Sequence, residues 1–410
     1  MSYAVAMLSI HTSPLDHPGS TKDAGGMNVY IRELAQELAN YHAQIDIFTR
    51  CTDEYTPQIV QLGKNTRVIH VQAGPVASLH KNDLYQYTPT FARYVDEFRR
   101  KEAIHYDLIH SHYWLSGVAA TRLACHWQIP HVTMFHTLGR LKQLANPNEP
   151  EPPLRLEMEQ RLIRHVDCII ASTPEVRNQM MRYCGATASR VAVIPCGVDL
   201  KHFRPFSRNL ARQRLGLPPG RPILLFAGRL DPFKGPDILL RAAALMQQDA
   251  LVVIVGGQVS ADKDIQQLRA LAQDLHIADR VLLLGARPRK DMPLFYSAAN
   301  VTVVPSYHET FGLVAVESLA CGTPVVATRA GGLTTIVHHG ENGFLVPRCP
   351  GFFAERLDAL LCDDALFSRL RSAARSSVIQ FSWNKVAQEV YEVYNELTNE
   401  ELLHFAQQKG

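Results

Sequence analysis

Two carboxylates flank a turn in the second half of the chain. The apolar run 300–304 predicts a buried parallel strand that ends at Pro305, and Gly312 opens a run with helical spacing. Glu309 precedes the predicted helix and Glu317 lies within it. Free backbone N–H groups at a helix start bind anions, so the turn could hold phosphates while the carboxylates accept hydrogen bonds from hydroxyl groups. A nucleotide-sugar has that layout. The alternative is that Glu309 is a solvated loop residue and Glu317 a residue on the surface of the helix.

Two cations flank a second turn of this kind. The apolar run 222–227 predicts a strand, and Arg229 and Lys234 follow it within the stretch 228–235. Cations at a strand-to-helix turn commonly neutralise a diphosphate. The pair therefore indicates a diphosphate site, with a solvated surface pair as the alternative.

A glycine pair separates the first predicted strand from the first predicted helix. The strand covers 4–10, and apolar residues from Ile31 to Leu38 have the spacing of one helix face. Gly25 and Gly26 let the backbone approach a ligand closely, with N–H groups pointing outward. We interpret the pair as part of a binding site, although a simple tight turn would use the same residues.

Polar side chains follow several predicted strands of the first half. They include His11 and the stretches 110–113 and 136–142. In open α/β sheets ligands bind beyond the carboxyl ends of strands, so these residues mark the candidate face. Two cations, a phenol and a hydroxyl group could form a phosphate pocket there. These four are Lys81, Arg155, Tyr113 and Thr137. Spacing alone does not bring them together, and each cation taken singly would be a surface charge.

Apolar runs alternate with amphipathic segments along the chain, which predicts an α/β fold with doubly wound parallel sheets. Because 410 residues exceed the usual size of a single core, two domains are expected. The basic, proline-containing stretch 201–205 places their boundary near residue 200. Predicted strands of the first domain are 4–10, 45–48, 68–71, 108–110, 131–135 and 168–171. Those of the second are 222–227, 251–255, 281–284, 301–304 and 324–327.

Composition and charge argue against several classes of protein. Apolar residues make up 46% and charged residues 20%, as in ordinary globular domains. A formal net charge of +3 argues against a nucleic-acid binder. The 8 cysteines include no C-x-x-C pair, which argues against a zinc site and favours free thiols in a reducing compartment. We recognise neither a signal peptide nor an apolar run of membrane-spanning length, so a cytoplasmic enzyme is expected.

The stretch 305–317, with the pattern P-S-x-x-E-x-F-G-L-x-x-x-E, and the stretch 320–327 after it resemble the signature of the retaining glycosyltransferases of family 4. The match spans a strand, a turn, a helix and the next strand. The resemblance implies the GT-B fold, with two facing Rossmann-like domains. Residues 1–200 would bind the acceptor and 201–382 the nucleotide-sugar, while 383–410 would form a helix that packs back on the first domain.

The resemblance also assigns roles to residues. It implies a UDP-sugar donor and same-face attack, in which the acceptor hydroxyl gives its proton to the departing diphosphate. No metal ion or other cofactor would be required. The catalytic residues would be His136, Arg229, Lys234 and Glu309. The donor would contact Gly25, Gly26, Arg229, Lys234, Glu309, Phe311, Gly312, Leu313 and Glu317. The acceptor phosphate would contact Lys81, Tyr113, Thr137 and Arg155.

Two branches of the family are similar to the first half. The stretches 9–15, 23–28 and 111–117 resemble the mycothiol-initiating inositol-phosphate glycosyltransferases. The stretch 136–142 is similar to the H-S-L-G-x-x-K motif of sucrose-phosphate synthases.

Each branch differs from this chain at one position. The mycothiol branch usually has Ala in place of Gly139, and the sucrose branch usually has Gln in place of Met27. Because Gly139 and Lys142 match the sucrose branch, the sequence favours UDP-glucose and fructose 6-phosphate as substrates, giving sucrose 6-phosphate. The alternative is UDP-N-acetylglucosamine with inositol phosphate.

The sequence disfavours two other classes of protein. A non-catalytic nucleotide-sugar sensor of the same fold is disfavoured by the intact Arg229, Lys234 and Glu309. A nicotinamide-dependent dehydrogenase is disfavoured because no G-x-G-x-x-G follows the first predicted strand. The sequence indicates no oligomeric state.

Overall fold

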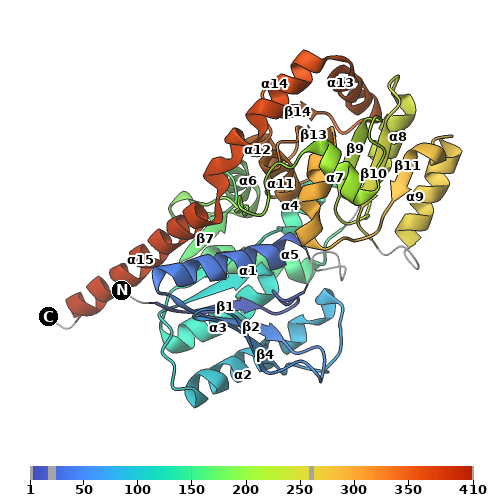
Figure 1. Cartoon of the computed structure of the whole chain (residues 1–410). Coiled ribbons are helices and arrows are strands. Elements are labelled where there is room, and N and C mark those ends of the chain that lie inside the picture. The colour runs from blue at the N-terminus through green and yellow to red at the C-terminus, as the bar shows by residue number, and fades with distance from the viewer. Residues whose placement is uncertain (1–2, 17–24, 149, 258–262, 409–410) are drawn as a thin grey trace. The chain divides into compact units, whose positions relative to one another are not determined.

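A computed structural model of the chain describes residues 3–16, 25–148, 150–257 and 263–408, with side chains as far as residue 399. The chain divides into two compact units (Figure 1): residues 1–197 with 383–410, and residues 198–382. The first unit ends at Gly197 rather than at residue 200. The reason is that the backbone N–H of Val198 already donates to the carbonyl of Phe381, at 2.7 Å, within the second unit.

Among the described residues, the first unit has an eight-stranded sheet with the order β3-β4-β2-β1-β5-β6-β7-β8. Its strands are β1 (Ala4–Ser9), β2 (Gln44–Arg50), β3 (Ile59–Gly63), β4 (Thr66–Val71), β5 (Leu108–His112), β6 (His131–Met134), β7 (Cys168–Ala171) and β8 (Val191–Val193). The sheet is mixed rather than purely parallel, because β3 pairs antiparallel with β4 at the edge. Sequence reasoning missed β3 because its side chains are exposed or half-buried and form no buried apolar run.

Helices of the first unit bury apolar faces on this sheet. They are α1 (Gly26–Leu38), α2 (Thr88–Lys101), α3 (Tyr113–Trp127), α4 (Gly139–Ala145), α5 (Pro153–His165), α6 (Pro174–Cys184) and α15 (Trp383–Gln408). The last helix packs along α1 (Figure 1), which confirms that the C-terminal segment returns to the first domain. Tyr391 of α15 contributes by stacking on Tyr41, with ring centroids 5.2 Å apart.

The second unit has a parallel sheet with the order β11-β10-β9-β12-β13-β14 in the part of the chain that the structure describes. Its strands are β9 (Ile223–Ala227), β10 (Leu251–Val255), β11 (Val281–Leu283), β12 (Val301–Val304), β13 (Val325–Thr328) and β14 (Gly343–Val346). This order is that of a doubly wound Rossmann sheet, as predicted. The edge strand β14 was not predicted.

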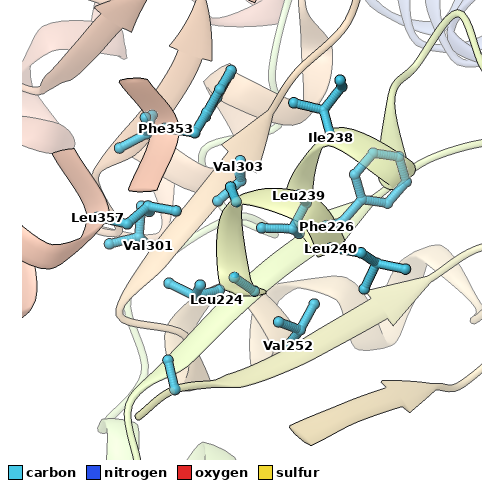
Figure 2. Close-up of a cluster of buried hydrophobic side chains, with 14 of the residues drawn as sticks. Leu224, Phe226, Ile238, Leu239, Leu240, Val252, Val301, Val303, Phe353 and Leu357 are labelled. Atoms are coloured by element: carbon cyan, nitrogen blue, oxygen red, sulfur yellow. The ribbon is translucent and has the colours of Figure 1, made fainter. Parts of the chain in front are cut away.

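Apolar side chains from strands and helices form the core of the second unit (Figure 2). Leu224, Val252 and Val301 of three strands meet Leu239 of α8 (Pro236–Leu245) and Phe353 of α13 (Pro350–Cys362), and all five are fully buried. Burying such side chains contributes about 1.5–3 kcal/mol each. The helices of this unit are α7 (Arg208–Leu215), α8 (Pro236–Leu245), α9 (Lys263–Asp274), α10 (Met292–Ala298), α11 (Leu313–Ala320), α12 (Leu333–Ile336), α13 (Pro350–Cys362) and α14 (Asp364–Ala374). In the described part of the chain, no helix is both long and apolar enough to cross a membrane.

Candidate active site

Several of the predicted site residues follow the strands where each sheet reverses its order. In the second unit this point lies between β9 and β12, and the loops after these strands carry Arg229, Lys234 and Glu309. In the first unit it lies between β1 and β5, with Gly25 and Tyr113 in the segments that follow. Ligands of open α/β sheets bind at such points.

Lys234 and Glu309 form an ion pair across two loops of the second unit. The Lys234 Nζ atom donates to Oε1 of Glu309 at 2.6 Å, and the hydroxyl of Ser306 donates to the same oxygen at 2.9 Å. Burial alone would raise the pKa of Glu309. The Lys234 charge and the hydrogen bonds from Lys234 and Ser306 outweigh it and lower that pKa. Glu309 is therefore a carboxylate at neutral pH.

Arg229 lies on the other side of the same turn. Its Nε atom is 3.3 Å from Oδ2 of Asp231, and 45% of its side chain is exposed. The other carboxylate oxygen of Asp231 accepts from the backbone N–H of Lys234 at 3.2 Å. Asp231 thus contacts the Arg229 side chain and the backbone of Lys234, the two cations of the predicted diphosphate site.

The two loops are tied together by close backbone contacts. Gly235 has φ +74°, and a Cβ atom there would lie 2.4 Å from the carbonyl oxygen of Pro305, so only glycine fits. The Tyr307 N–H donates to the Phe233 carbonyl at 2.8 Å. Arg348 adds a hydrogen bond to the Pro305 carbonyl at 2.9 Å. Sequence reasoning missed Arg348, because no spacing signal connects it to the site.

Helix α11 begins at the turn predicted to hold phosphate. Gly312, its N-cap, has φ +109°, and an added Cβ would lie 2.8 Å from Leu333. In the described residues no side chain caps this helix start. Phe311 is buried against Phe381, with ring centroids 5.5 Å apart, and Leu313 is half-buried.

Glu317 lies within α11, and both of its carboxylate oxygens have partners. Arg289 donates to Oε1 at 3.1 Å and the Tyr296 hydroxyl donates to Oε2 at 2.9 Å. The side chain is 11% exposed. Its contact with the donor stays a prediction. Arg289 and Tyr296 were not identified from the sequence.

The glycine pair of the first unit lies at the start of α1. Gly25 is its N-cap and Gly26 its first residue, and a Cβ at Gly25 would meet no atom within 4 Å. Asn28 accepts from the Gly25 N–H at 3.0 Å and donates to Thr12 at 2.6 Å, which ties α1 to the loop after β1. The first residues of the resembling stretch, 23–24, lie outside the described part of the chain.

Three of the four predicted phosphate ligands meet in the first unit. The Arg155 guanidinium carbon lies 5.0 Å from the Tyr113 ring centroid, and Nη2 donates to the Thr137 hydroxyl at 3.1 Å. Arg155 also forms ion pairs with Glu151 and Glu159, each at 2.7 Å. Its side chain is 4% exposed. The guanidinium is therefore already held by two carboxylates that sequence reasoning missed.

Lys81, the fourth predicted ligand, begins a short 3-10 helix (Lys81–Asp83). Leu84, which follows this 3-10 helix directly, packs in the same buried cluster as Tyr113. Tyr85 stacks on Trp114 with ring centroids 5.9 Å apart. Burial raises the pKa of Tyr113 to about 12 although Arg155 opposes the shift, so its phenol stays protonated.

His136 follows β6 and has a strained backbone, with φ +58°. Burial, together with nearby His110 and His11, lowers its pKa to about 3, so the imidazole is neutral at physiological pH. Its Nε2 atom lies 3.1 Å from Nδ1 of His112. No group of three or more His, Cys, Asp or Glu side chains in the described residues has the arrangement of a metal site.

Two protein families match the two halves of the chain. The family described as Glycosyltransferase Family 4 matches residues 24–202, and the one described as Glycosyl transferases group 1 matches residues 207–377. The D-inositol 3-phosphate glycosyltransferase of Xylanimonas cellulosilytica is 43% identical over 96% of this chain and 97% of the relative. The protein of the same name from Nocardiopsis dassonvillei is also 43% identical, over 96% of this chain and 94% of its own length.

Solved structures are similar over nearly the whole chain. The sucrose-phosphate synthase of Thermosynechococcus elongatus has a TM-score of 0.91 at 34% identity and covers 97% of this chain and 100% of its own. The Anabaena protein HepE, in complex with UDP and glucose, has a TM-score of 0.77 at 23% identity and covers 96% and 100%. At that identity the second likeness supports the fold alone.

Proposed function

The chain belongs to the retaining glycosyltransferases of family 4, which have the GT-B fold, and from this premise we propose that it transfers N-acetylglucosamine from its UDP-sugar to inositol phosphate. The observation that supports inositol phosphate as the acceptor is the 43% identity to two relatives named D-inositol 3-phosphate glycosyltransferase, over 97% and 94% of their lengths. The cluster of Arg155, Tyr113 and Thr137 supports a phosphorylated acceptor.

Transfer from UDP-glucose to fructose 6-phosphate is the second candidate. The sequence alone favours it through Gly139 and Lys142, and the 34% identity to a sucrose-phosphate synthase supports it. Lys142 forms an ion pair with Glu151 at 2.8 Å, so it belongs to the same charged group as Arg155. The greater identity to the inositol phosphate enzymes leads us to rank this candidate second.

The proposed donor site uses charges of the second unit. Arg229, Lys234 and the uncapped start of α11 would stabilise the departing diphosphate, and Glu309 would accept hydrogen bonds from sugar hydroxyls. A sugar hydroxyl at Glu309 would find an acceptor that is ionised at neutral pH. We propose that the positive charges of Arg229 and Lys234 make a metal ion unnecessary.

The proposed reaction retains configuration at the sugar carbon. The bond between that carbon and the diphosphate breaks while the acceptor oxygen bonds to the same face. The acceptor proton passes to the oxygen of the leaving diphosphate. The protein contributes positioning and charge stabilisation, with His136 beside the donor sugar.

An acceptor screen tests the proposal. UDP-N-acetylglucosamine and UDP-glucose are each combined with inositol phosphate, fructose 6-phosphate and glucose 6-phosphate, and UDP release is measured with and without EDTA. We expect the fastest release from UDP-N-acetylglucosamine with inositol phosphate, unchanged by EDTA. Faster release with fructose 6-phosphate would favour the second candidate. Loss of activity in EDTA, restored by magnesium, would contradict metal independence.

Lys81 is a better probe of the acceptor phosphate than Arg155. Removing Arg155 would leave the buried Glu159 unpaired, which costs about 3–5 kcal/mol and would obscure any effect on binding. Lys81 is only half-buried, so Lys81→Ala should preserve the fold. We expect it to raise the acceptor KM and leave the affinity for UDP unchanged.

A further inference from the structure

A line of ring side chains extends from His136 into the interior of the first unit. Next to His136 lies His112, whose ring centroid is 4.3 Å from that of His110. The Nδ1 atom of His110 lies 2.7 Å from the hydroxyl oxygen of Tyr394 on α15. His110, His112 and Tyr394 are fully buried. The line therefore connects the C-terminal helix to the end of β6.

Several polar atoms along this line have no partner. Among the described residues, the Nε2 atoms of His110 and His112 are buried without a hydrogen bond, as are the Tyr30 hydroxyl and Nε1 of Trp383. Tyr30 packs against the rings of His112, His136 and Trp383, so these atoms belong to one cluster. His112 has one hydrogen bond through its ring, the one to His136.

That single bond indicates where the proton of His112 lies. Burial lowers the pKa of both His112 and His136, so both rings are neutral at physiological pH. In a neutral pair one ring N–H donates and a nitrogen of the other ring accepts. Among buried backbone groups an N–H without an acceptor is rarer than a C=O without a donor, and a buried ring N–H without a partner carries the same kind of desolvation cost. The proton of His112 is therefore expected on Nδ1, which has a partner, and the lone pair on Nε2.

We propose that His112 is a positioning residue: its Nδ1–H donates to Nε2 of His136 and holds His136 as the tautomer protonated on Nδ1. His136 then presents an N–H donor at Nδ1, and its ring cannot turn without breaking this bond. The His110 ring packs against His112, and the Tyr394 hydroxyl on α15 bonds to His110. Helix α15 therefore helps to hold the His112 ring in place. The inference rests on the proposed function, which places His136 beside the donor sugar.

Ring-nitrogen NMR of the full-length protein tests the tautomer without any ligand. Histidine is labelled with nitrogen-15, and the His136 signals are identified by their loss in His136→Gln. We expect a protonated Nδ1 and an unprotonated Nε2 in His136. A proton on Nε2 would overturn the proposal. Because no turnover is involved, this result stands whether or not the proposed reaction is correct.

Two substitutions at His112 then test its effect on transfer. His112→Asn keeps an N–H donor near the position of Nδ1, whereas His112→Leu fills similar volume without one. We expect His112→Leu to lower kcat by about 10- to 100-fold with a smaller change in donor KM, and His112→Asn to restore most of the loss. Equal losses in both variants, with equal loss of melting temperature, would show a merely structural role and overturn the proposal.

The two measurements remain separable when one of them fails. If His112→Leu does not fold, the ring-nitrogen result for the unsubstituted protein decides the tautomer. If the unsubstituted protein releases no UDP with any acceptor, the proposed function is wrong, and the same ring-nitrogen result still decides whether His112 holds His136.

Discussion

The ion pair of Lys234 and Glu309 makes the stability of the second unit depend on pH. The pKa of Glu309 is lowered in the folded chain from its ordinary value of 4.5, so the pair stabilises the fold above that pH. This contribution is lost as the pH falls through the lowered pKa. We therefore expect the difference in unfolding free energy between the unsubstituted protein and Lys234→Gln to be largest near neutral pH. It should shrink below about pH 4.5 in urea titrations.

The same substitution should affect turnover more than folding. Loss of one charged donor to a developing negative charge costs about 2.7–4 kcal/mol, or roughly 100- to 1000-fold in kcat. Arg221→Gln is a suitable control, because Arg221 lies in the same unit and pairs with the exposed Asp249. A near-normal kcat in Lys234→Gln would show that Lys234 does not act in the donor site. In the urea titrations, a stability difference that does not change with pH would contradict a contribution from the ion pair.

Glu151 is expected to compete with the acceptor phosphate for cations. It binds Nη1 of Arg155 at 2.7 Å and Nζ of Lys142 at 2.8 Å, so a phosphate that uses either group must displace or share it. Glu151→Gln should therefore lower the acceptor KM, by up to about tenfold, without changing the UDP affinity. Glu157→Gln is the control, since Glu157 lies on α5 near Arg155, is exposed and pairs with Arg161. A raised acceptor KM would show that Glu151 supports Arg155 instead of competing.

At the scale of elements, buried apolar runs made most of the fold predictable. The runs at 251–255 and 301–304 became β10 and β12 because strands covered on both faces are apolar throughout. The edge strands β3 and β14 were not predicted, because neither forms a long buried apolar run. β3 is half-exposed, and β14 has only four residues and begins at Gly343.

The partners of the site residues were harder to predict than the residues themselves. Glu159 follows Arg155 at helical i,i+4 spacing, a signal that could have identified this pair. Ser306 lies close to Glu309 in sequence but carries no signal of its own. Arg348 reaches the Pro305 carbonyl from after β14, and such contacts depend on tertiary packing that local spacing does not encode.

The packing of α4 on α5 links residue 139 to the acceptor group. A Cβ at Gly139 would lie 2.9 Å from Leu156, 3.2 Å from Nε of Arg155 and 3.3 Å from Oε2 of Glu159. Gly139→Ala must therefore shift this ion pair by a few tenths of an ångström.

We expect Gly139→Ala to raise the acceptor KM by up to about tenfold and to cost about 1–3 kcal/mol of stability. Gly351→Ala is the matched control, because Gly351 also lies in a first helical turn and an added Cβ meets no atom within 4 Å. An unchanged acceptor KM with reduced stability would show that residue 139 affects packing alone.

At the scale of the whole molecule, the two units share the order of the parallel strands around the switch point, apart from the edge strands β3 and β8 of the first unit, and differ in the charges near it. In the second unit, Lys234 and Arg229 are accessible beside an uncapped helix start. In the first, Arg155 is buried between Glu151 and Glu159. We therefore expect the donor diphosphate to bind the second unit and the acceptor phosphate, which must compete with protein carboxylates, to bind the first.

Hydrogen exchange can test whether the donor binds to the second unit and the acceptor phosphate to the first. A ligand stabilises the unit that binds it by RT ln(1 + [L]/Kd), about 2.7 kcal/mol at 100 times Kd. UDP should therefore slow exchange in the loops 228–235 and 305–312 of the second unit, which carry Lys234 and Glu309 of the proposed donor site. Inositol phosphate should instead protect 81–85 and 137–142 in the first unit. Protection by UDP at 137–142 with none at 228–235 would contradict the assignment, because the diphosphate would then bind at the Arg155 cluster rather than at Lys234.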